Sequence, residues 1–467
     1  MHLLRKARAA VLVSAFPLVA ATSTPTVKVD PGDGLVDHPF AVTVSGAKPG
    51  ANIVIEAKVE DEQTPPQSWT AVGQYRADSK GEIMTSRAAS TGGSYRGVLA
   101  GGLACSALPV PHEDIPAFLE KLGKTPGRTS PLLGTRDSFT VAITATADGK
   151  RIGSSTITRR YVASDVTTTP VAEGRVNGLY FAPARVTGIP VVALGGSGGG
   201  VPSAQAGLLA SRGHPALALA YFNYKDLKPS LVEIPLETFA DGARWLSAKA
   251  GAKRVALIGT SRGSEAVQLT AAYFPDHVAG LVGYVPSPLV HGGFGPDVQP
   301  WQSAWTLDGR SIPFPRFEAA DDRPPNERRD AAGDAPPGYA GSPRFMTEWS
   351  NPIAYDYYAT PLARIDVPML LLGGGEDTMW PSAFGATKIK ERMTTLGKGD
   401  LVELHNYPGA GHGLSRVGIA NAISGFSVHP VSKRWSSTGG DPEANCAASY
   451  DAWQRVLEFL DRLAPSG

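Results

Sequence analysis

The 467-residue sequence predicts an α/β protein with an amino-terminal antiparallel β-sandwich and a carboxy-terminal, mainly parallel, doubly wound sheet. Three observations support this fold class. Short runs in the first third of the chain alternate polar and apolar residues, whereas later apolar runs alternate with helical patterns. The length also exceeds that of one usual domain, so we expect two domains.

Residues 24–165 carry the predicted sandwich. The segments 40–44, 52–57 and 139–144 have the two-residue period of half-buried strands, and clusters of glycine and proline separate them. Several short strands at this spacing are typical of an antiparallel sandwich. One helical turn is expected near residues 115–122, and we find no catalytic constellation in this domain.

Residues 176–467 carry the predicted α/β domain. Its near-continuous apolar runs are typical of strands buried on both faces of a sheet, and helical patterns lie between them. A polar, proline-rich insertion at about residues 296–351 interrupts the pattern and is expected to be a lid or a mobile surface loop. The apolar runs are residues 191–194, 216–220, 254–258 and 367–372, and the helical patterns are residues 237–248 and 265–274.

The charge balance excludes some classes of partner. With 44 Lys and Arg against 43 Asp and Glu, the formal net charge is +1, which argues against a dedicated binder of nucleic acid or anionic membranes. After the amino-terminal leader, no apolar run approaches the length of a membrane span. We therefore expect a small-molecule substrate.

Residues 1–21 have the features of a signal peptide. Three basic residues precede an apolar run at residues 9–21, which ends in the small residues Ala20 and Ala21. We expect export to the periplasm or to the medium. A basic leader on a cytoplasmic protein is the alternative.

The sequence contains two cysteines, Cys105 and Cys446. An oxidising compartment would permit a bridge, but two cysteines so far apart do not form a disulfide framework, so we expect each to be free and buried. Neither cysteine has the spacing of a metal ligand, and the histidines are scattered. No metal and no cofactor are expected.

The pentapeptide Gly259-Thr260-Ser261-Arg262-Gly263 follows an apolar run and opens a helical pattern. In that context Gly-x-Ser-x-Gly forms a sharp strand-to-helix turn that exposes the serine hydroxyl above the sheet. Ser261 is therefore the predicted nucleophile, and a plain strand-to-helix turn is the alternative.

A serine hydroxyl needs a base to take its proton, and an acid usually orients that base. His412, in a glycine-rich loop after a late strand, is the predicted base, and Asp377, after the preceding strand, is the predicted acid. His405 and His291 are weaker candidates for the base, and Glu376 is the alternative acid. The order Ser, Asp, His is that of an α/β-hydrolase.

The glycine-rich segment 195–200 follows an early strand and predicts an oxyanion hole. One donor should be the backbone amide of Arg262, and the other that of Ser197 or Gly198. Phosphate binding is the alternative, but the lysine and Ser/Thr of a P-loop and the dinucleotide fingerprint are missing.

These motifs resemble those of the acyl-CoA thioesterase and bile-acid-CoA:amino-acid N-acyltransferase family, over nearly all of the mature chain. The resemblance implies hydrolysis of a fatty acyl-CoA by Ser261, Asp377 and His412. In the amine-transferring branch the nucleophile is usually cysteine, so serine here favours hydrolysis. The residues that carry the resemblance are 93–97, 102–103, 196–200, 218–227, 259–265, 375–377, 380–382, 411–413, 453 and 456–460.

The substrate stays open at this level. CoA thioesters are cytosolic or organellar, whereas the leader predicts export, so an exported enzyme would cleave another thioester or ester. An exported carboxylesterase or peptidase with the same triad is one alternative, and a non-catalytic binding protein is another. Trp301, Trp305 and Trp349 of the insertion could cover an acyl chain or pack locally.

Overall fold

The computed structural model describes residues 24–62, 66–111, 114, 117, 138–316, 342–418, 427–431, 435–436 and 438–463. The predicted signal peptide lies outside the described residues, as do the centre of the insertion and nearly all of the helical turn expected at residues 115–122. No helix in the described part of the chain is both long enough and apolar enough to cross a membrane.

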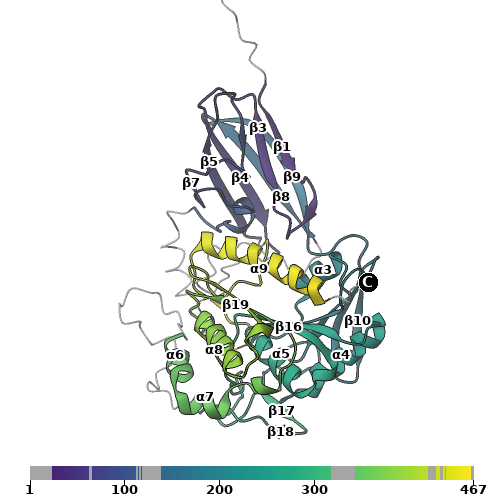
Figure 1. The fold of residues 1–467 in the computed structure, drawn as a ribbon. Helices are drawn as coiled ribbons and strands as arrows, with labels where there is room; N and C mark the ends of the chain where they lie inside the picture. Colours follow the sequence, from purple (N-terminus) through teal and green to yellow (C-terminus); the bar gives the residue numbers. More distant parts are fainter. Residues whose placement is uncertain are drawn as a thin grey trace, which may run out of the picture.

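The amino-terminal part is a β-sandwich (Figure 1). Its larger sheet has the order β2-β9-β8-β4-β5-β7 and its smaller sheet the order β1-β3-β6, with mostly antiparallel pairs. Inward-facing residues of β3, β4 and β8 share one apolar core between the sheets. The elements are β1 (Thr26–Asp30), β2 (Gly34–Leu35), β3 (Ala41–Ser45), β4 (Asn52–Glu60), β5 (Ser68–Arg76), β6 (Ile83–Met84), β7 (Gly92–Gly93), α1 (Gly102–Cys105), β8 (Ser138–Ala147) and β9 (Lys150–Arg160).

The carboxy-terminal part is built on an eight-stranded sheet of order β10-β11-β13-β12-β15-β16-β19-β20. The strands from β13 to β20 pair in parallel, and β10 and β11 add an antiparallel edge. The predicted α/β fold class is therefore confirmed. The strands are β10 (Thr167–Glu173), β11 (Val176–Ala182), β12 (Val191–Leu194), β13 (Ala216–Ala220), β15 (Val255–Thr260), β16 (Val278–Tyr284), β19 (Met369–Gly374) and β20 (Val402–Tyr407).

Helices cover both faces of this sheet. Val192 and Leu194 of β12 join one core with α4, α5 and α8, whereas Val191 and Ala193 join a second core with α3 and α9. Because successive side chains of a strand point to opposite faces, this division buries both faces, as the apolar runs predict. The helices are α3 (Ser203–Ser211), α4 (Glu237–Ala250), α5 (Arg262–Tyr273), α8 (Ser382–Thr395) and α9 (Pro442–Leu463).

The insertion is partly folded and is not simply a surface loop. Trp305 and Trp349 are buried packing residues, whereas the side chain of Trp301 is 60% exposed. Trp305 donates to Glu265 of α5, and Trp349 packs against Trp380, which follows β19; α7 comes directly after the insertion. The elements of this region are β14 (Ile234–Pro235), β17 (Trp305–Leu307), β18 (Arg310–Ser311), α6 (Ser342–Ser350) and α7 (Pro352–Tyr358), and a short hairpin, β21 (Ser427–Val428) and β22 (Trp435–Ser436), follows β20.

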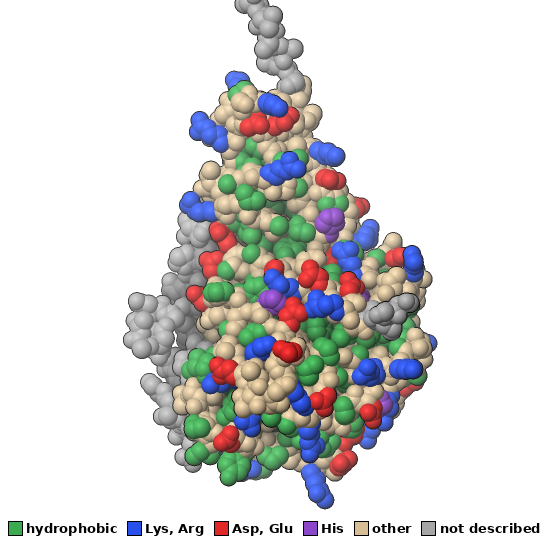
Figure 2. Space-filling view, in the orientation of Figure 1, with side chains coloured by type: hydrophobic (Ala, Val, Ile, Leu, Met, Phe, Trp, Pro, Cys, Tyr) green, Lys and Arg blue, Asp and Glu red, His purple; other side chains and the backbone are tan. Residues whose placement is uncertain are grey.

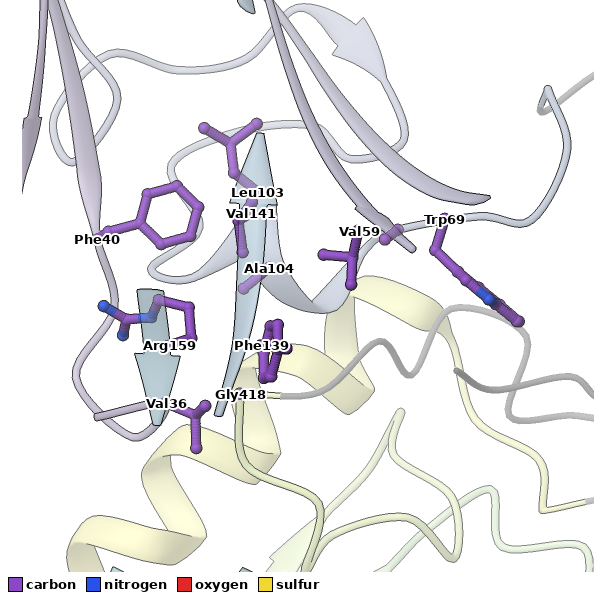
Figure 3. Close-up of a pocket in the computed structure, with 11 residues that line it drawn as sticks. Val36, Phe40, Val59, Trp69, Leu103, Ala104, Phe139, Val141, Arg159 and Gly418 are labelled. Carbon is purple, nitrogen blue, oxygen red and sulfur yellow. The ribbon is translucent and has the colours of Figure 1, made fainter. Parts of the chain in front are cut away.

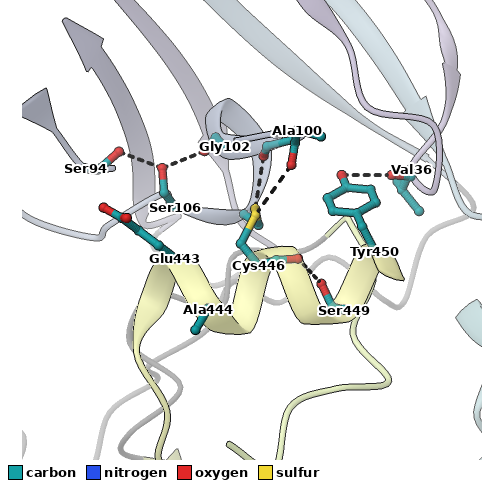
Figure 4. The surroundings of a disulfide bond; sticks show 12 residues. Val36, Ser94, Ala100, Gly102, Ser106, Glu443, Ala444, Cys446, Ser449 and Tyr450 are labelled. Carbon is teal, nitrogen blue, oxygen red and sulfur yellow. Dashed lines mark hydrogen bonds between the residues drawn. A yellow bond between two sulfur atoms is a disulfide. The ribbon is translucent and has the colours of Figure 1, made fainter. Parts of the chain in front are cut away.

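Cys105 and Cys446 form a disulfide bond, so the expectation that both are free is wrong (Figure 4). Cys105 ends α1 of the sandwich and Cys446 lies in the first turns of α9, with their Cα atoms 5.6 Å apart. The two cysteines are 341 residues apart in sequence and meet only because the sandwich packs against α9, so the bond could not be predicted from their spacing.

Helix α9 lies between the sandwich and the main sheet (Figure 1). The fully buried carboxylate of Asp37 accepts hydrogen bonds from Arg212 at 2.9 Å and from Trp453 Nε1 at 2.8 Å. Figure 3 shows a small apolar cavity nearby, where Val36 and Phe139 of the sandwich face Gly418 of the catalytic domain. The two domains are therefore joined by a disulfide, by the ion pair of the buried Asp37 with the more exposed Arg212, and by apolar packing.

Candidate active site

Ser261 lies in the sharp turn between β15 and α5. Its backbone has φ 57° and ψ −119°, a conformation that is rare for a residue other than glycine and that concentrates at functional sites. The backbone N–H of Ser261 donates to the carbonyl of Tyr284 at 2.9 Å, which ties the turn to β16. A Cβ on Gly263 would lie 2.3 Å from the carbonyl oxygen of Gly195, so only glycine allows α5 to start this close to the glycine-rich loop.

Asp377 and His412 are brought together, with Nδ1 of the imidazole 2.7 Å from Oδ2 of the carboxylate. Asp377 follows β19 and His412 follows β20, and these strands are parallel neighbours whose carboxyl ends meet at one edge. The Asp377 side chain is fully buried, whereas Glu376 is exposed. The structure therefore pairs the imidazole with Asp377 and not with the alternative acid.

Ser382 is a further residue of this site; it lies in the segment 380–382 that carries the family resemblance, but the sequence analysis assigned it no role. Its hydroxyl donates to Asp377 Oδ2 at 2.6 Å, and the backbone amides of Met379 and Trp380 donate to Oδ1 at 2.9 and 3.3 Å. Four donors, counting His412, therefore fix the Asp377 carboxylate. The available signal was the position of Ser382 at the start of α8, five residues after the acid.

Ser261 approaches the same sheet edge from β15, with β16 and β19 between it and β20. No hydrogen bond joins the Ser261 hydroxyl to His412 among the residues that the structure describes. Such contacts are often long without substrate and tighten in the complex, so the arrangement is compatible with base catalysis.

The two other candidate bases have other partners. Nε2 of His405 lies 2.8 Å from Glu403, within a half-buried ion-pair group on β20. Nδ1 of the buried His291 lies 3.3 Å from Glu265. Neither imidazole pairs with Asp377, so His412 is the histidine of this acid.

The glycine-rich loop lies directly beside the nucleophile. A Cβ on Gly196 would lie 3.1 Å from Ser261 Cβ and 3.6 Å from its Oγ. Within the described ranges, the backbone amides of Ser197, Gly198 and Arg262 have no hydrogen-bond partner. They are therefore available to an oxyanion, as an oxyanion hole requires.

Three side chains hold this loop. Tyr221 donates through its hydroxyl to the carbonyl of Gly195 at 2.6 Å, and Asn223 donates to that of Gly198 at 3.0 Å. His429 Nε2 lies 2.9 Å from the Ser197 hydroxyl, while its Nδ1 accepts from a backbone amide at 3.2 Å. Because Nδ1 accepts, Nε2 carries the proton and donates to Ser197.

On the face shown in Figure 2, acidic and basic side chains are interspersed, in keeping with the net charge of +1. In the part of the chain with described coordinates, no group of three or more His, Cys, Asp or Glu side chains is placed to hold a metal ion.

Two regions of the chain match models of one protein family. Residues 37–173 match the model described as the acyl-CoA thioester hydrolase/BAAT N-terminal region, and residues 347–464 match the BAAT/acyl-CoA thioester hydrolase C-terminal model. Together these regions cover more than half of the chain.

Full-length relatives agree with these matches. The chain is 27% identical to mouse mitochondrial acyl-coenzyme A thioesterase 2, covering 95% of this chain and 90% of the relative, and 28% identical to mouse acyl-coenzyme A thioesterase 5, covering 94% and 96%. Among solved structures, a monoacylglycerol lipase of Paleococcus ferrophilus is 17% identical over 59% of this chain and 97% of its own, with a TM-score of 0.34. With a TM-score this low, the fold assignment rests on the strand order given above. The chain belongs to the BAAT/acyl-CoA thioester hydrolase family, which confirms the resemblance carried by its motifs.

Proposed function

We propose that this protein hydrolyses acyl thioesters through an acyl-enzyme formed on Ser261. The observation that carries the proposal is the Asp377–His412 hydrogen bond of 2.7 Å at the sheet edge to which the strained Ser261 turn also belongs. Family membership supports the thioester as the substrate class, and the relatives' names make a fatty acyl-CoA the first substrate to test.

In the proposed mechanism, His412 Nε2 accepts the Ser261 proton as Oγ attacks the acyl carbonyl. Asp377 holds the proton on Nδ1, so that Nε2 is free to act as the base. The oxyanion is stabilised by the amide of Arg262 and by that of Ser197 or Gly198, each worth about 3 kcal/mol in the transition state. As the intermediate collapses, the leaving thiolate takes the proton from His412 and departs as the thiol. The neutral imidazole then accepts a proton from water as the water oxygen attacks the acyl-enzyme, and it returns that proton to Ser261 Oγ as the acid leaves.

Serine at position 261 supports hydrolysis over transfer to an amine. The test is to compare kcat/KM on a long-chain acyl-CoA, a p-nitrophenyl ester and a peptide amide, together with labelling by a fluorophosphonate probe. We expect the thioester to be the best of the three substrates and labelling to vanish in Ser261→Ala. A preference for the plain ester or the amide would favour a carboxylesterase or a peptidase, and absence of labelling would favour a binding protein.

We also propose that the protein works in an oxidising compartment. The disulfide between Cys105 and Cys446 supports this location, because such bonds persist outside the cytosol, and the leader at residues 1–21 supports export. An exported enzyme would meet acyl thioesters of thiols other than CoA, or esters, so the substrate panel should include an acyl-N-acetylcysteamine. Fractionation of the source cells, with amino-terminal sequencing of the mature protein, tests the location; an uncleaved protein in the cytosol would contradict it.

A further inference from the structure

A second carboxylate–imidazole pair lies beside the catalytic one and has no part in the mechanism above. Glu265 is on α5, one helical turn after Ser261, and its side chain is fully buried. Its carboxylate accepts from the backbone N–H of His291 at 2.8 Å and from Trp305 Nε1 at 2.5 Å, and lies 3.3 Å from His291 Nδ1. Burial disfavours the charged form, but Arg262 and the His291 contacts hold the pKa of Glu265 below its ordinary value.

The hydrogen bonds fix the tautomer of His291. The Trp349 indole N–H, which can only donate, points at His291 Nε2 at 3.3 Å. Nε2 is therefore the acceptor, and Nδ1 carries the proton that faces the Glu265 carboxylate. The imidazole is held at both nitrogens, so its ring plane is fixed.

The rings of His291 and His412 both contact the indole of Trp380. The His291 ring stacks on the indole of Trp380 with centroids 5.5 Å apart and planes at 28°, and the same indole meets the His412 ring edge-to-face at 5.8 Å. The backbone amide of Trp380 also donates to Asp377, and its indole N–H donates to the carbonyl of Val285 at 3.0 Å. The indole of Trp380 therefore packs between the imidazole of His412 and that of His291.

The same carboxylate also restrains the residue next to the nucleophile. The Arg262 guanidinium lies 3.5 Å from Glu265 and donates to the carbonyls of His291 and Gly292 at 3.2 and 2.9 Å. Glu265 therefore contacts Arg262 at the start of α5 and also His291, which stacks on Trp380 beside His412.

We propose that Glu265 is a positioning residue of the hydrolase, which sets the imidazole of His412 relative to Ser261 through His291 and Trp380. This inference rests on the proposed serine mechanism. In Glu265→Gln the carbonyl oxygen will keep the position of Oε1, which accepts from two N–H groups, so the NH2 group will face the N–H at Nδ1 of His291. If His291 instead moves its proton to Nε2, that N–H will face the N–H of Trp349. Either way the stack on Trp380 is disturbed.

The experiment compares Glu265→Gln with wild type and with Asp37→Asn. Asp37 is a matched control, because it is also a buried carboxylate held by an arginine and a tryptophan, but it lies at the junction of the two domains. The measurements are the rate constant and the end-point of fluorophosphonate labelling, kcat and KM on a p-nitrophenyl ester, and the melting temperature.

We expect Glu265→Gln to lower the labelling rate constant and kcat by about 10- to 100-fold, with a full labelling end-point and little change in KM. Asp37→Asn should lose a similar amount of thermal stability and keep the wild-type rate constant. Since the end-point counts folded molecules and the rate constant does not, a merely structural role would lower only the end-point.

A wild-type rate constant in Glu265→Gln would overturn the proposal, as would equal losses of rate in both variants. If Glu265→Gln does not fold, His291→Asn replaces it, because asparagine can still donate to Glu265 but cannot stack on Trp380. A lowered rate constant of labelling in His291→Asn would support the proposal, and an unchanged one would refute it. If wild type itself is not labelled, the serine mechanism fails and not this inference alone.

Discussion

Replacing Asp377 by asparagine tests the catalytic geometry most directly, because the structure fixes how the new amide must sit. Oδ1 of Asp377 accepts from two backbone amides, those of Met379 and Trp380, which cannot rotate away. The carbonyl oxygen of asparagine will keep that position, so its NH2 group will occupy the position of Oδ2. There it faces Nδ1 of His412, which lies 2.7 Å away in the native protein.

An NH2 group at that position must donate to Nδ1 and thereby moves the imidazole proton to Nε2. An imidazole protonated at Nε2 cannot accept the Ser261 proton. We therefore expect kcat to fall by about 10⁴-fold, the loss typical of this replacement in a Ser-His-Asp triad, which corresponds to about 5.5 kcal/mol of transition-state stabilisation. The fold should survive, because the hydrogen bond from Ser382 can reverse its direction.

The assay is steady-state hydrolysis of an acyl thioester alongside the rate of fluorophosphonate labelling. Glu376→Gln is the matched control, since Glu376 is the adjacent carboxylate and is exposed. We expect it to stay within about twofold of wild type, as surface substitutions usually do. Retention of more than about a tenth of kcat in Asp377→Asn would show that Asp377 does not orient His412, and the reasoning on its hydrogen bonds would be refuted.

Three further outcomes follow from the packing and the buried groups. Gly263→Ala should destabilise the fold by about 1–3 kcal/mol in denaturant titrations and abolish labelling, because its Cβ would lie 2.3 Å from the carbonyl of Gly195; normal labelling would contradict this close contact. Cys446→Ser should lower stability by about 2–5 kcal/mol, and thiol titration of the wild-type protein unfolded without reductant should find neither Cys446 nor Cys105 reactive; free thiols would disprove the bridge. Burial lowers the pKa of His214 from its ordinary 6.5, so below pH 6.5 the unfolded chain binds a proton that the folded protein does not, and the free energy of unfolding decreases as the pH falls. His214→Asn should therefore reduce the decrease of the melting temperature between about pH 6.5 and 5. An unchanged decrease would assign the pH dependence to other groups.

The sequence predicts the part of the site that local pattern controls. Gly259 to Gly263 determine a turn within one pentapeptide, and the apolar runs before Asp377 and His412 determine which sheet edge receives their side chains. Because parallel strands end at the same edge, chain order and strand ends are enough to predict that Asp377 lies near His412. Their 2.7 Å contact agrees with that reasoning.

The remainder depends on contacts between distant segments, which leave no local signature. The Cys105–Cys446 bond, the hydrogen bond from His429 to Ser197 and the pairing of Glu265 with His291 each join residues that only tertiary packing brings together. For the same reason the sequence could not separate packing tryptophans from exposed ones in the insertion.

The sandwich contributes no side chain to the catalytic pair, yet the contacts link it to the loops that carry that pair. The backbone N–H of His412 donates to the carbonyl of Thr438 at 2.7 Å, and Asp377 forms an isolated β-bridge with Gly439, so the segment between β22 and α9 contacts both residues. Asn445, near the start of α9, accepts from the backbone N–H of Gly411, and the next residue is bonded through its sulfur to the sandwich. The disulfide thus joins the sandwich to the end of α9 that contacts the loop of His412, whereas the contacts of Asp37 lie further along the helix, at Trp453.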